Sequence, residues 1–383
     1  MIQRRILCIS FSPLQRDARV RRQLAVLREF GEVTSVGYGP APDESSHHLA
    51  IPENAISLPQ TPAGIAKLAM RRHQGLELSA PGEQAALKLL RDSGPWDFVV
   101  ANDARALPLA FAAADGAPVW ADLHEWAPQE NSANLAWRLL VGPYMDAVCR
   151  RYLSRAAAVS TVGAAIADLY KARYGVTAQV LRNAIPDQGL SPSAVDPHRI
   201  RLVHSGVAVP ERNIEALIDA AHQLADRFDL DLYLVGDPAG YLGTLVKRAK
   251  RTENVRVMDP VPAAELPAVL NAYDLGVYVL PVRSLNHRLM LPNKFFDFVQ
   301  ARIGLIFGSS EETDRLIVEH GLGRIVPQST TRSLAAVLRE LTTDDVIRFK
   351  CNADIAAPAL SNESDLAAQR ALVEHVLQAR TAP

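Results

Sequence analysis

A lysine and an aspartate stand at the start of an apolar, helix-like segment within residues 289–312, LMLPNKFFDFVQARIGLIFGSSEE. Pro292 suits the first turn of a helix, because its missing N–H would have no partner there. The amides of 293–295 would then point toward an anion, with the Lys294 ammonium beside them. Asp297 lies nearly one turn further on the same side, where its carboxylate can accept hydrogen bonds from two vicinal hydroxyls. We expect a diphosphate at the lysine and a ribose at the aspartate; a surface ion pair worth roughly 0–1 kcal/mol is the alternative.

Two glycines follow apolar strands and precede helices, Gly206 in SGVAVPERN and Gly236 in GDPAGY. A small residue at such a point lets a phosphate or a base approach the backbone closely. Neither loop is the G-x-G-x-x-G fingerprint of dinucleotide sites, so a plain strand-exit turn is an equal interpretation. With their neighbours Ser205 and Asp237, and with Asn293, these glycines are candidate donor-side residues.

Arg212 lies just before a predicted helix at 213–228. Its guanidinium could reach a diphosphate together with the amides at the helix N-terminus. A solvated pair with Glu211 or Glu215 is the alternative.

His124 and Glu125 end an apolar strand in ADLHEW. A histidine at a strand exit can hydrogen-bond a sugar hydroxyl and act near neutral pH, although a lone histidine is more often structural. No second His or Cys lies at metal-ligand spacing, and the sequence contains no P-loop, nucleophile elbow or His-Glu-x-x-His, so we expect neither metal nor cofactor. Four further polar residues of the first half are candidates for the acceptor side: Asp17, Arg19, Asp103 and Asn183.

Short apolar strands alternate with helical patterns along nearly the whole chain. Such continuous apolar strands indicate parallel sheets covered on both faces, with ligands beyond the carboxyl ends of the strands. We therefore predict an α/β protein of two doubly wound, Rossmann-like domains facing a central cleft. The strands are predicted at 5–12, 32–39, 97–103, 118–125, 157–163 and 178–183, and then at 199–206, 231–236, 255–259, 275–281, 303–308 and 323–326.

The predicted domains are 1–184 and 199–360, joined by a hinge at 185–198 that is rich in Pro, Ser and Asp. A final amphipathic helix occupies 361–383. Asp17 is predicted to cap a helix at 18–29. Residues 40–60 are expected to form a polar loop with weak strand signals.

Length, composition and charge fit a globular protein with an ordinary core. The 383 residues are 48% hydrophobic and 22% charged, with a formal charge of −1, so no large positive field is expected to attract nucleic acid. Three widely spaced cysteines and the lack of a signal peptide or a long apolar span favour the cytoplasm. The stretches 66–74 and 137–155 mix apolar and basic residues, and are either core helices or a contact with anionic lipid at the inner face of a membrane.

Four segments occur in an order that resembles the GT-B glycosyltransferases of the group 1, glycogen-synthase-like type. They are RDARVRRQLAVLREFGEV, VWADLHEWAPQE, STVGAAIADLYKARYG with VLRNAIP, and LPNKFFDFVQARIGLIFG. The resemblance covers residues 4 to about 330. It implies a GT-B fold whose last helix crosses back to the N-terminal domain.

The resemblance also implies roles for individual residues. Lys294 is similar to the lysine of the P-x-K-x-x-E signature near the donor diphosphate, and Asp297 stands where that signature usually has a ribose-binding Glu. Ser205, Gly206 and Arg212 resemble the loop over the phosphates.

In the same way, Val261 matches the segment whose backbone reads the base, and His124 with Glu125 resembles a pair facing the transferred sugar. The chain departs from the family at several positions. Leu289 stands where the family has the first Glu of Glu-x7-Glu, Val207 replaces an Arg, and Asp259-Pro260 replaces a Gly.

The implied activity is transfer of a sugar from a nucleotide-diphosphate sugar to a hydroxyl acceptor, with retention. The acceptor would be a glycan, a lipid-linked molecule or a small molecule, in surface-polysaccharide, glycoconjugate or natural-product synthesis. Two other functions stay open: a sugar-nucleotide 2-epimerase, which uses the same two domains, and a non-catalytic GT-B subunit that binds a partner or a glycan.

Overall fold

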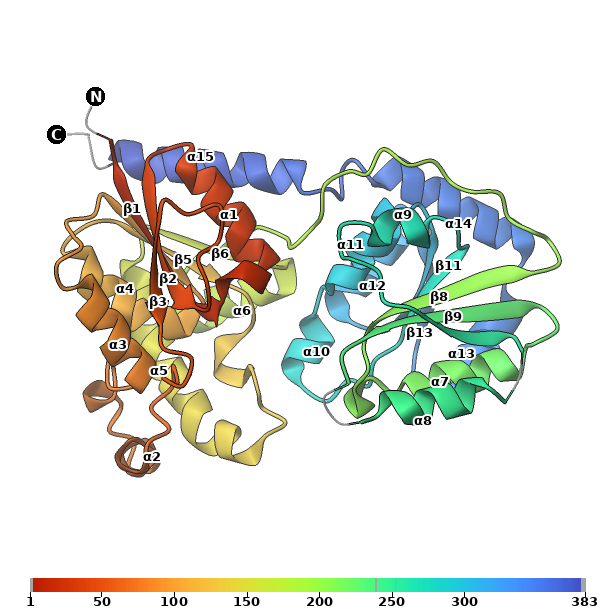
Figure 1. Cartoon of the computed structure of the whole chain (residues 1–383), viewed down its shortest axis with the longest axis horizontal. Helices are drawn as coiled ribbons and strands as arrows, with labels where there is room; N and C mark the ends of the chain where they lie inside the picture. The colour runs from red at the N-terminus through yellow and green to blue at the C-terminus, as the bar shows by residue number, and fades with distance from the viewer. Residues whose placement is uncertain (1–2, 238–239, 252, 380–383) are drawn as a thin grey trace. The chain divides into compact units, whose positions relative to one another are not determined.

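The computed structural model describes residues 3–237, 240–251 and 253–379. The chain forms two compact units (Figure 1). Unit 1 comprises Met1–Asn183, Ser284–Asn286 and Asp365–Pro383, and unit 2 comprises Ala184–Arg283 and His287–Ser364.

Unit 1 contains a seven-stranded parallel sheet of order β3-β2-β1-β4-β5-β6-β7. The chain starts in the middle of this sheet, runs to one edge and then to the other, so the direction of winding reverses between β1 and β4. The strands are β1 (Arg5–Pro13), β2 (Glu32–Tyr38), β3 (His47–Ile51), β4 (Phe98–Asn102), β5 (Val119–Leu123), β6 (Ala158–Thr161) and β7 (Gln179–Val180).

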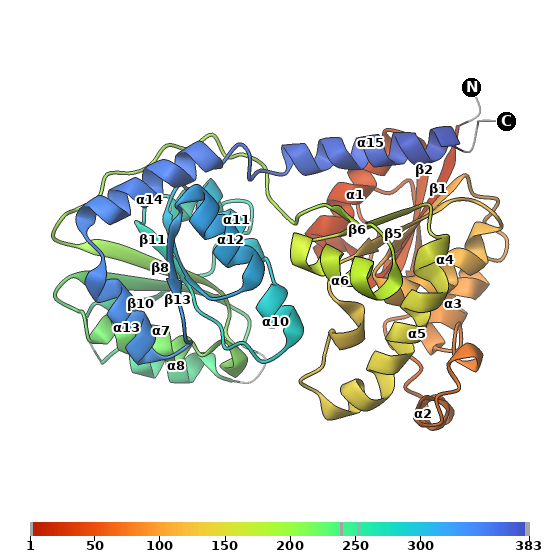
Figure 2. The ribbon, with the colours of Figure 1, turned by 180° about the vertical axis from the view of Figure 1, so that it is seen from behind.

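Helices cover both faces of the unit 1 sheet (Figures 1 and 2). On one face, α1 and α15 bury Leu24, Leu27 and Val373 against Ile6 and Phe98 of the sheet. The α-helices are α1 (Ala18–Arg28), α2 (Pro62–Ala69), α3 (Pro81–Leu90), α4 (Leu107–Ala114), α5 (Gly142–Tyr152), α6 (Ala164–Tyr174) and α15 (Glu363–Ala379). Shorter turns are η1 (Leu14–Arg16), η2 (His73–Gly75), η3 (Ala104–Ala106), η4 (Ala127–Gln129), the π-helix η5 (Trp137–Val141) and η6 (Leu153–Arg155).

Unit 2 repeats this architecture with six parallel strands in the order β10-β9-β8-β11-β12-β13, and its winding reverses between β8 and β11. The strands are β8 (Ile200–Val207), β9 (Phe228–Val235), β10 (Val255–Met258), β11 (Leu275–Tyr278), β12 (Gly304–Gly308) and β13 (Gly323–Val326).

Two apolar cores fill the faces of the unit 2 sheet, one under α7, α8 and α13 and the other under α9, α11 and α12 (Figure 1). The four phenylalanines Phe295, Phe296, Phe298 and Phe307 lie in the second core. The helices are α7 (Ile214–His222), α8 (Leu242–Ala249), α9 (Leu266–Leu270), α10 (Leu285–Leu289), α11 (Asn293–Gln300), α12 (Glu311–His320), α13 (Thr331–Glu340), α14 (Thr343–Ala356) and the 3-10 turn η7 (Pro210–Arg212).

All twelve predicted strands are present, with β9 starting earlier than expected at Phe228. The segment 40–60, predicted to be a polar loop with weak strand signals, contains strand β3, which pairs in parallel with β2 at the sheet edge. The predicted helix at 213–228 is wrong beyond His222: the helix ends there, and Phe228 pairs with Ile200 in the sheet. Its apolar period continues past the helix end because Leu224 and Phe228 pack in the same core as α7.

The predicted hinge at 185–198 belongs to unit 2 instead of standing apart from both units. Arg302 binds Asp187 at 2.7 Å, and Ser193 donates to the carbonyl of Asn271 at 2.7 Å. Buried Lys350 donates to Ser193 at 2.9 Å. These bonds hold the segment against unit 2. The chain passes from one unit to the other at 183–184, 283–284, 286–287 and 364–365.

The last helix contributes to the core of unit 1 through Leu372, Val373 and Val376. Residues 380–383 of the predicted helix at 361–383 lie outside the described residues. Among the described helices, none is long and apolar enough to cross a membrane.

Candidate functional site

The carboxyl ends of β8 and β11 meet where the winding of unit 2 reverses, which is the usual place for a ligand in such a sheet. Residues 204 and 206 of β8 face the same side of the sheet, because side chains alternate along a strand. A Cβ at Gly206 would lie 2.2 Å from Arg212 Nη1 and 3.6 Å from His204 Nε2. The absence of a side chain at 206 therefore makes room for the Arg212 guanidinium, on the side of the strand that His204 Nε2 also faces.

Arg212 ends the short turn η7 and is half-buried. Neither Glu211 nor Glu215 forms an ion pair with it in the described part of the chain, so the predicted alternative of a solvated pair is wrong. Its neighbour Asn213 has φ of +50° and donates to the carbonyl of Ser329 at 2.9 Å, which fixes the end of the turn. A half-buried guanidinium without a counterion is suited to an anionic ligand.

Lys294 and Asp297 form an ion pair of 2.8 Å on α11, with side-chain exposures of 20% and 12%. The pair is thus largely buried, unlike the exposed surface pair considered from the sequence. Pro292 is the N-cap of α11 instead of a residue of its first turn. Its carbonyl accepts the N–H of Phe295 at 2.9 Å, so that amide does not point at an anion as predicted.

His204 is a site residue that the sequence analysis missed. The His204 side chain is 1% exposed, and its Nδ1 lies 2.9 Å from the carbonyl oxygen of Val277. Its imidazole ring stacks on the ring of Tyr278. Burial, followed by the charges of Arg212 and Lys294, lowers the pKa of His204 to about 4. The signal available in the sequence was the period of two that places 204 and 206 on one face.

The other donor-side candidates are more dispersed. Gly236 has φ of +65° and is exposed, and Asp237 accepts from the amide of Leu242 at 2.9 Å, in a loop whose residues 238–239 are outside the described set. Val261 is half-buried against the core that contains α11, and Asn293 is exposed at the start of that helix. Ser205 is buried, on the opposite side of β8 from His204, and its hydroxyl has no hydrogen-bond partner among the described residues.

The structure also shows where the three departures from the family pattern lie. Val207 is the last residue of β8, and Asp259 with Pro260 is exposed after β10. Leu289 is 3% exposed, so the site of the missing first Glu is occupied by a buried apolar side chain.

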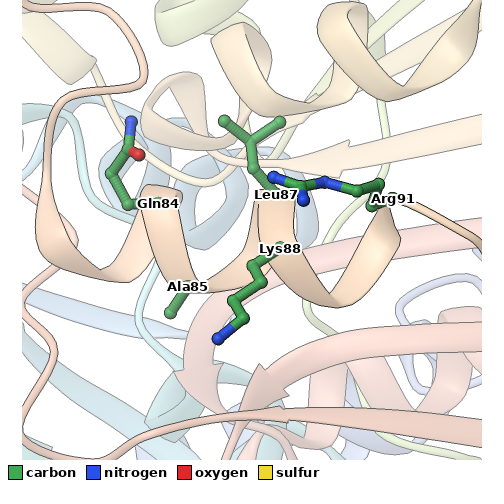
Figure 3. Close-up of a pocket in the computed structure, with 5 residues that line it drawn as sticks. All are labelled: Gln84, Ala85, Leu87, Lys88 and Arg91. Carbon is green, nitrogen blue, oxygen red and sulfur yellow. The ribbon is translucent and has the colours of Figure 1, made fainter.

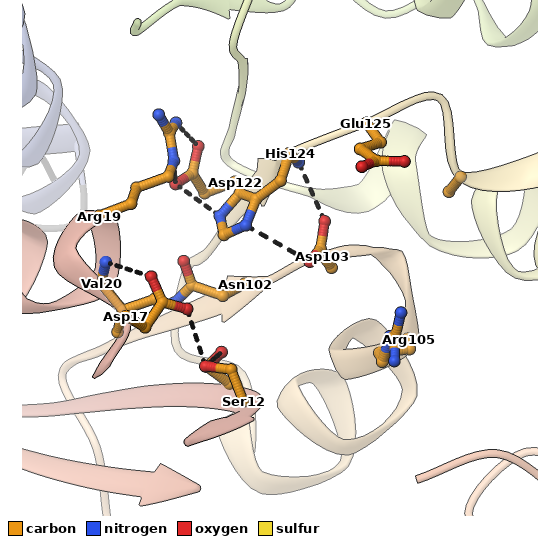
Figure 4. Close-up of polar contacts among 12 residues, drawn as sticks. Ser12, Asp17, Arg19, Val20, Asn102, Asp103, Arg105, Asp122, His124 and Glu125 are labelled. Atoms are coloured by element: carbon orange, nitrogen blue, oxygen red, sulfur yellow. Dashed lines mark hydrogen bonds and ion pairs between the residues drawn. The ribbon is translucent and has the colours of Figure 1, made fainter. Parts of the chain in front are cut away.

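In unit 1, Arg19 of α1 and Asp122 of β5 form a buried ion pair (Figure 4). Arg19 binds Asp122 through Nη2 at 2.7 Å and through Nε at 3.0 Å, and its Nη1 donates to the carbonyl of Leu181 at 2.8 Å. Although burial alone would raise it, the charges of Arg19 and His124 hold the pKa of Asp122 well below its usual range. Arg19 is 6% exposed, so its place is under the site and not at its surface.

His124 lies between two carboxylates, with Nδ1 3.4 Å from Asp103 and Nε2 3.4 Å from Asp122 (Figure 4). Burial disfavours the imidazolium, but these carboxylates outweigh it and raise the pKa of His124 above its ordinary value. Asp103 has φ of +65° and ψ of 158°, a conformation that costs an L-residue of the order of 1–3 kcal/mol. Its carboxylate accepts the N–H of His124 at 2.9 Å, so this strained residue holds the histidine at the end of β5.

Glu125 follows His124 and keeps an exposed surface. Desolvation by the protein around it, together with the charges of Glu130 and Asp103, raises its pKa to about 7. It accepts a hydrogen bond of 2.9 Å from Asn286, which groups with unit 1. A carboxyl group of this kind can exchange a proton near neutral pH.

The remaining acceptor-side candidates serve local structure. Asp17 caps α1 by accepting the N–H of Val20 at 3.1 Å, as predicted, and also accepts from Ser12 at 2.8 Å. Asn183 accepts a hydrogen bond from Arg22. Within the described ranges, no group of three His, Cys, Asp or Glu side chains is arranged to hold a metal ion.

Two open recesses lie apart from these residues. One of about 690 Å³ lies along α3 and is lined by Gln84, Ala85, Leu87, Lys88 and Arg91 (Figure 3). The other, of about 380 Å³, is lined by Ala194, Val195, Asp196, Arg199, Arg201 and Asp229. Neither contains a nucleophile or a candidate site residue.

Comparison with protein families gives a match over residues 199–344 to the family described as "Glycosyl transferases group 1". The matched residues lie in unit 2, apart from 284–286, which group with unit 1. A comparison with curated proteins finds no significant match.

Solved structures similar to the whole chain have the GT-B fold. Sucrose-phosphate synthase from Thermosynechococcus elongatus has a TM-score of 0.71 at 13% identity, covering 99% of this chain and 100% of the other. A glycosyltransferase from Rickettsia africae has a TM-score of 0.66 at 12% identity, covering 98% and 99%. HepE of Anabaena, in complex with UDP and glucose, has a TM-score of 0.64 at 16% identity, covering 97% and 99%. The predicted fold of two doubly wound domains is confirmed.

We predict that Arg19→Met lowers the free energy of unfolding by about 3–5 kcal/mol, because it leaves the Asp122 carboxylate buried without its cation. Urea unfolding measures this loss, and adding Asp122→Asn to Arg19→Met should restore part of it. The control is Arg370→Met, which breaks an exposed pair with Glu29 and should cost no more than about 1 kcal/mol. Equal losses in the two single variants would contradict the structural role of Arg19.

The buried His204 also predicts a pH dependence of stability. Its pKa is about 4 in the folded chain against an ordinary 6.5, so the unfolded chain binds more protons between these values. The neutral His204 therefore contributes about 3 kcal/mol to the free energy of unfolding. This contribution is complete above pH 6.5 and is lost as the pH falls toward 4. Urea unfolding across this range should show a smaller decline for His204→Phe than for the wild type, and parallel declines would contradict the assignment.

Proposed function

We propose that this chain is a glycosyltransferase that moves a sugar from a nucleoside-diphosphate sugar to a hydroxyl acceptor, because its residues 199–344 match the group 1 family. The observation that carries the proposal is the pair of cations, Arg212 and Lys294, near the carboxyl ends of β8 and β11 in the matched region. HepE, a structure of the same fold, is in complex with UDP and glucose, which supports a nucleoside diphosphate as the ligand of such a site. Retention of configuration rests on the family resemblance.

The cations account for how the leaving group is stabilised. As the bond to the sugar breaks, negative charge gathers on the diphosphate, and fixed positive charges aimed at it stabilise the transition state more than the ground state. Arg212 contributes a planar guanidinium and Lys294 an ammonium with three donors. In this proposal the protein supplies the charge that the departing diphosphate needs.

The ion pair on α11 leaves hydrogen-bond donors of Lys294 and acceptor sites of Asp297 available for the nucleotide. Lys294 uses one donor on Asp297, so two remain for phosphate oxygens. Asp297 uses Oδ2 for that bond, and a carboxylate has about four lone-pair sites, enough for ribose hydroxyls as well. The two residues can therefore bind diphosphate and ribose without first separating.

The residues of unit 1 are assigned to the sugar and the acceptor. Asp103 and Asp122 fix the orientation of His124, which can then hydrogen-bond a sugar hydroxyl. Glu125 has a pKa of about 7 and can take the proton of the attacking hydroxyl near neutral pH. Buried Leu289 supplies no polar contact to the donor sugar at the position of the missing Glu.

We predict that Lys294→Ala lowers kcat/KM for transfer by roughly 10²–10³-fold while the melting temperature changes little, because one charge-stabilising donor is lost. Transfer from UDP- and GDP-sugars, with products identified by NMR, measures this. The matched control is Lys247→Ala, an exposed lysine of α8.

Each rival function gives a different result in the same assay. A 2-epimerase would yield an epimerised nucleotide sugar without an acceptor. A non-catalytic subunit would bind neither UDP nor GDP in calorimetry. An unchanged transfer rate in Lys294→Ala would remove the central assignment.

We also propose that unit 1 contacts anionic lipid through a patch on α2 and η5, which pack together. Met70 and Leu135 are 56% and 57% exposed, although both are large and apolar. The sequence contains no acid between 61 and 76 or between 131 and 145. Apolar anchors among basic side chains suit a surface of anionic lipid headgroups. The patch consists of Ile65, Met70, Leu135 and Leu139 with Lys67, Arg71, Arg72 and Arg138.

Vesicle sedimentation tests this patch. The wild type should sediment with vesicles of phosphatidylcholine mixed with phosphatidylglycerol, and not with phosphatidylcholine alone. Met70→Glu with Leu135→Glu should weaken binding by roughly tenfold or more, because two anchors become anions. The control is Val318→Glu with Ile355→Glu, at residues 73% and 78% exposed on unit 2. Equal binding by both double variants would contradict the proposal.

A further inference from the structure

His204 has one hydrogen-bonding direction that is fixed. Its Nδ1 lies 2.9 Å from the carbonyl oxygen of Val277, and a carbonyl only accepts, so Nδ1 carries the proton. The stacked ring of Tyr278, with an interplanar angle of 15°, restrains the plane of the imidazole. In the neutral ring, Nε2 is therefore an acceptor of known direction.

That acceptor has no partner among the described residues. Nε2 is buried and makes no hydrogen bond with any of them, and leaving such an atom unpaired is unfavourable. It faces the space where a side chain at Gly206 would begin, and the Arg212 guanidinium enters that same space. An unpaired acceptor and an unpaired cation thus share one small gap.

The charged groups around His204 determine the protonation state of its imidazole ring. Arg212 from η7 and Lys294 from α11 both act on it, and Tyr278 from β11 covers its ring. The two cations and the burial lower its pKa to about 4, so the ring is neutral at pH 7. A neutral Nε2 cannot donate to a phosphate, but it can accept from a guanidinium.

We propose that His204 is a positioning residue of the diphosphate site. Arg212 makes no hydrogen bond to Nε2 in this structure, but a small shift of its side chain lets Nε2 accept from the guanidinium and hold it over Gly206, facing the diphosphate. The proposal rests on the proposed function for its ligand. Arg212 has five N–H donors, enough to bind His204 and two phosphate oxygens together. His204 acts through Arg212 and does not touch the reacting atoms.

Three substitutions separate this role from a structural one. His204→Gln keeps a polar atom near the position of Nε2 but loses the bond to Val277. His204→Asn keeps the donor to Val277 but has nothing at Nε2, and His204→Phe keeps only the ring. The proposal predicts that Gln retains affinity for UDP or GDP within about threefold, while Asn and Phe lose roughly tenfold or more. A purely structural role at Val277 predicts the reverse order.

Calorimetry with the nucleoside diphosphate that binds the wild type more tightly, UDP or GDP, measures these affinities, with melting temperatures as a check on folding. Arg212→Ala combined with His204→Phe should lose no more affinity than Arg212→Ala alone, because the histidine acts only through the arginine. Additive losses, or retention by Asn with loss in Gln, would overturn the proposal.

The hydrogen bond proposed between the two side chains can also be tested without nucleotide. Nitrogen NMR of the His204 ring should show Nε2 accepting a hydrogen bond in the wild type and losing it in Arg212→Ala. An unchanged Nε2 resonance in that variant would overturn the proposal. Failure of the wild type to bind any nucleoside diphosphate would instead defeat the proposed function, and the NMR result would still decide the role of His204.

Discussion

The missing side chain at Gly206 is the constraint on which the candidate site in unit 2 depends. The carboxyl ends of β8 and β11 lie side by side where the winding of the sheet reverses. Any side chain at 206 would occupy the space that the Arg212 guanidinium enters. A Cβ there would stand 2.2 Å from Nη1, a distance that real contacts do not reach. Gly206 thus makes room for Arg212, and the phosphate-binding loop proposed here needs no glycine-rich fingerprint.

The two units divide the chemistry between opposite charges. In the described part of unit 2, Arg212 forms no ion pair and Lys294 pairs with one carboxylate, so positive charge is left for a diphosphate. In unit 1, Asp103 and Asp122 flank His124, and Glu125 has a pKa near neutrality. In the proposed mechanism, the first arrangement stabilises a leaving anion, while the second orients hydroxyls and accepts a proton.

Much of this could be predicted from the sequence, because strand ends are visible in it. Apolar runs broken by polar residues located His124 and Gly206 correctly at the ends of β5 and β8. Two site residues buried inside strands, Asp122 and His204, were not identified from the sequence. Asp122 pairs with Arg19, and His204 lies close to Arg212. A sequence does not show which distant side chain lies next to a buried one. Arg19 was placed at the acceptor side for the same reason. Strand β3 was missed because His47 and His48 give an edge strand little apolar signal.

The most direct test of the account is a crystal structure of the chain grown with a nucleoside-diphosphate sugar. The account predicts phosphate oxygens within hydrogen-bonding distance of both Arg212 and Lys294, with the ribose hydroxyls on Asp297. A nucleotide bound at another place, with Lys294 and Asp297 still joined only to each other, would contradict it.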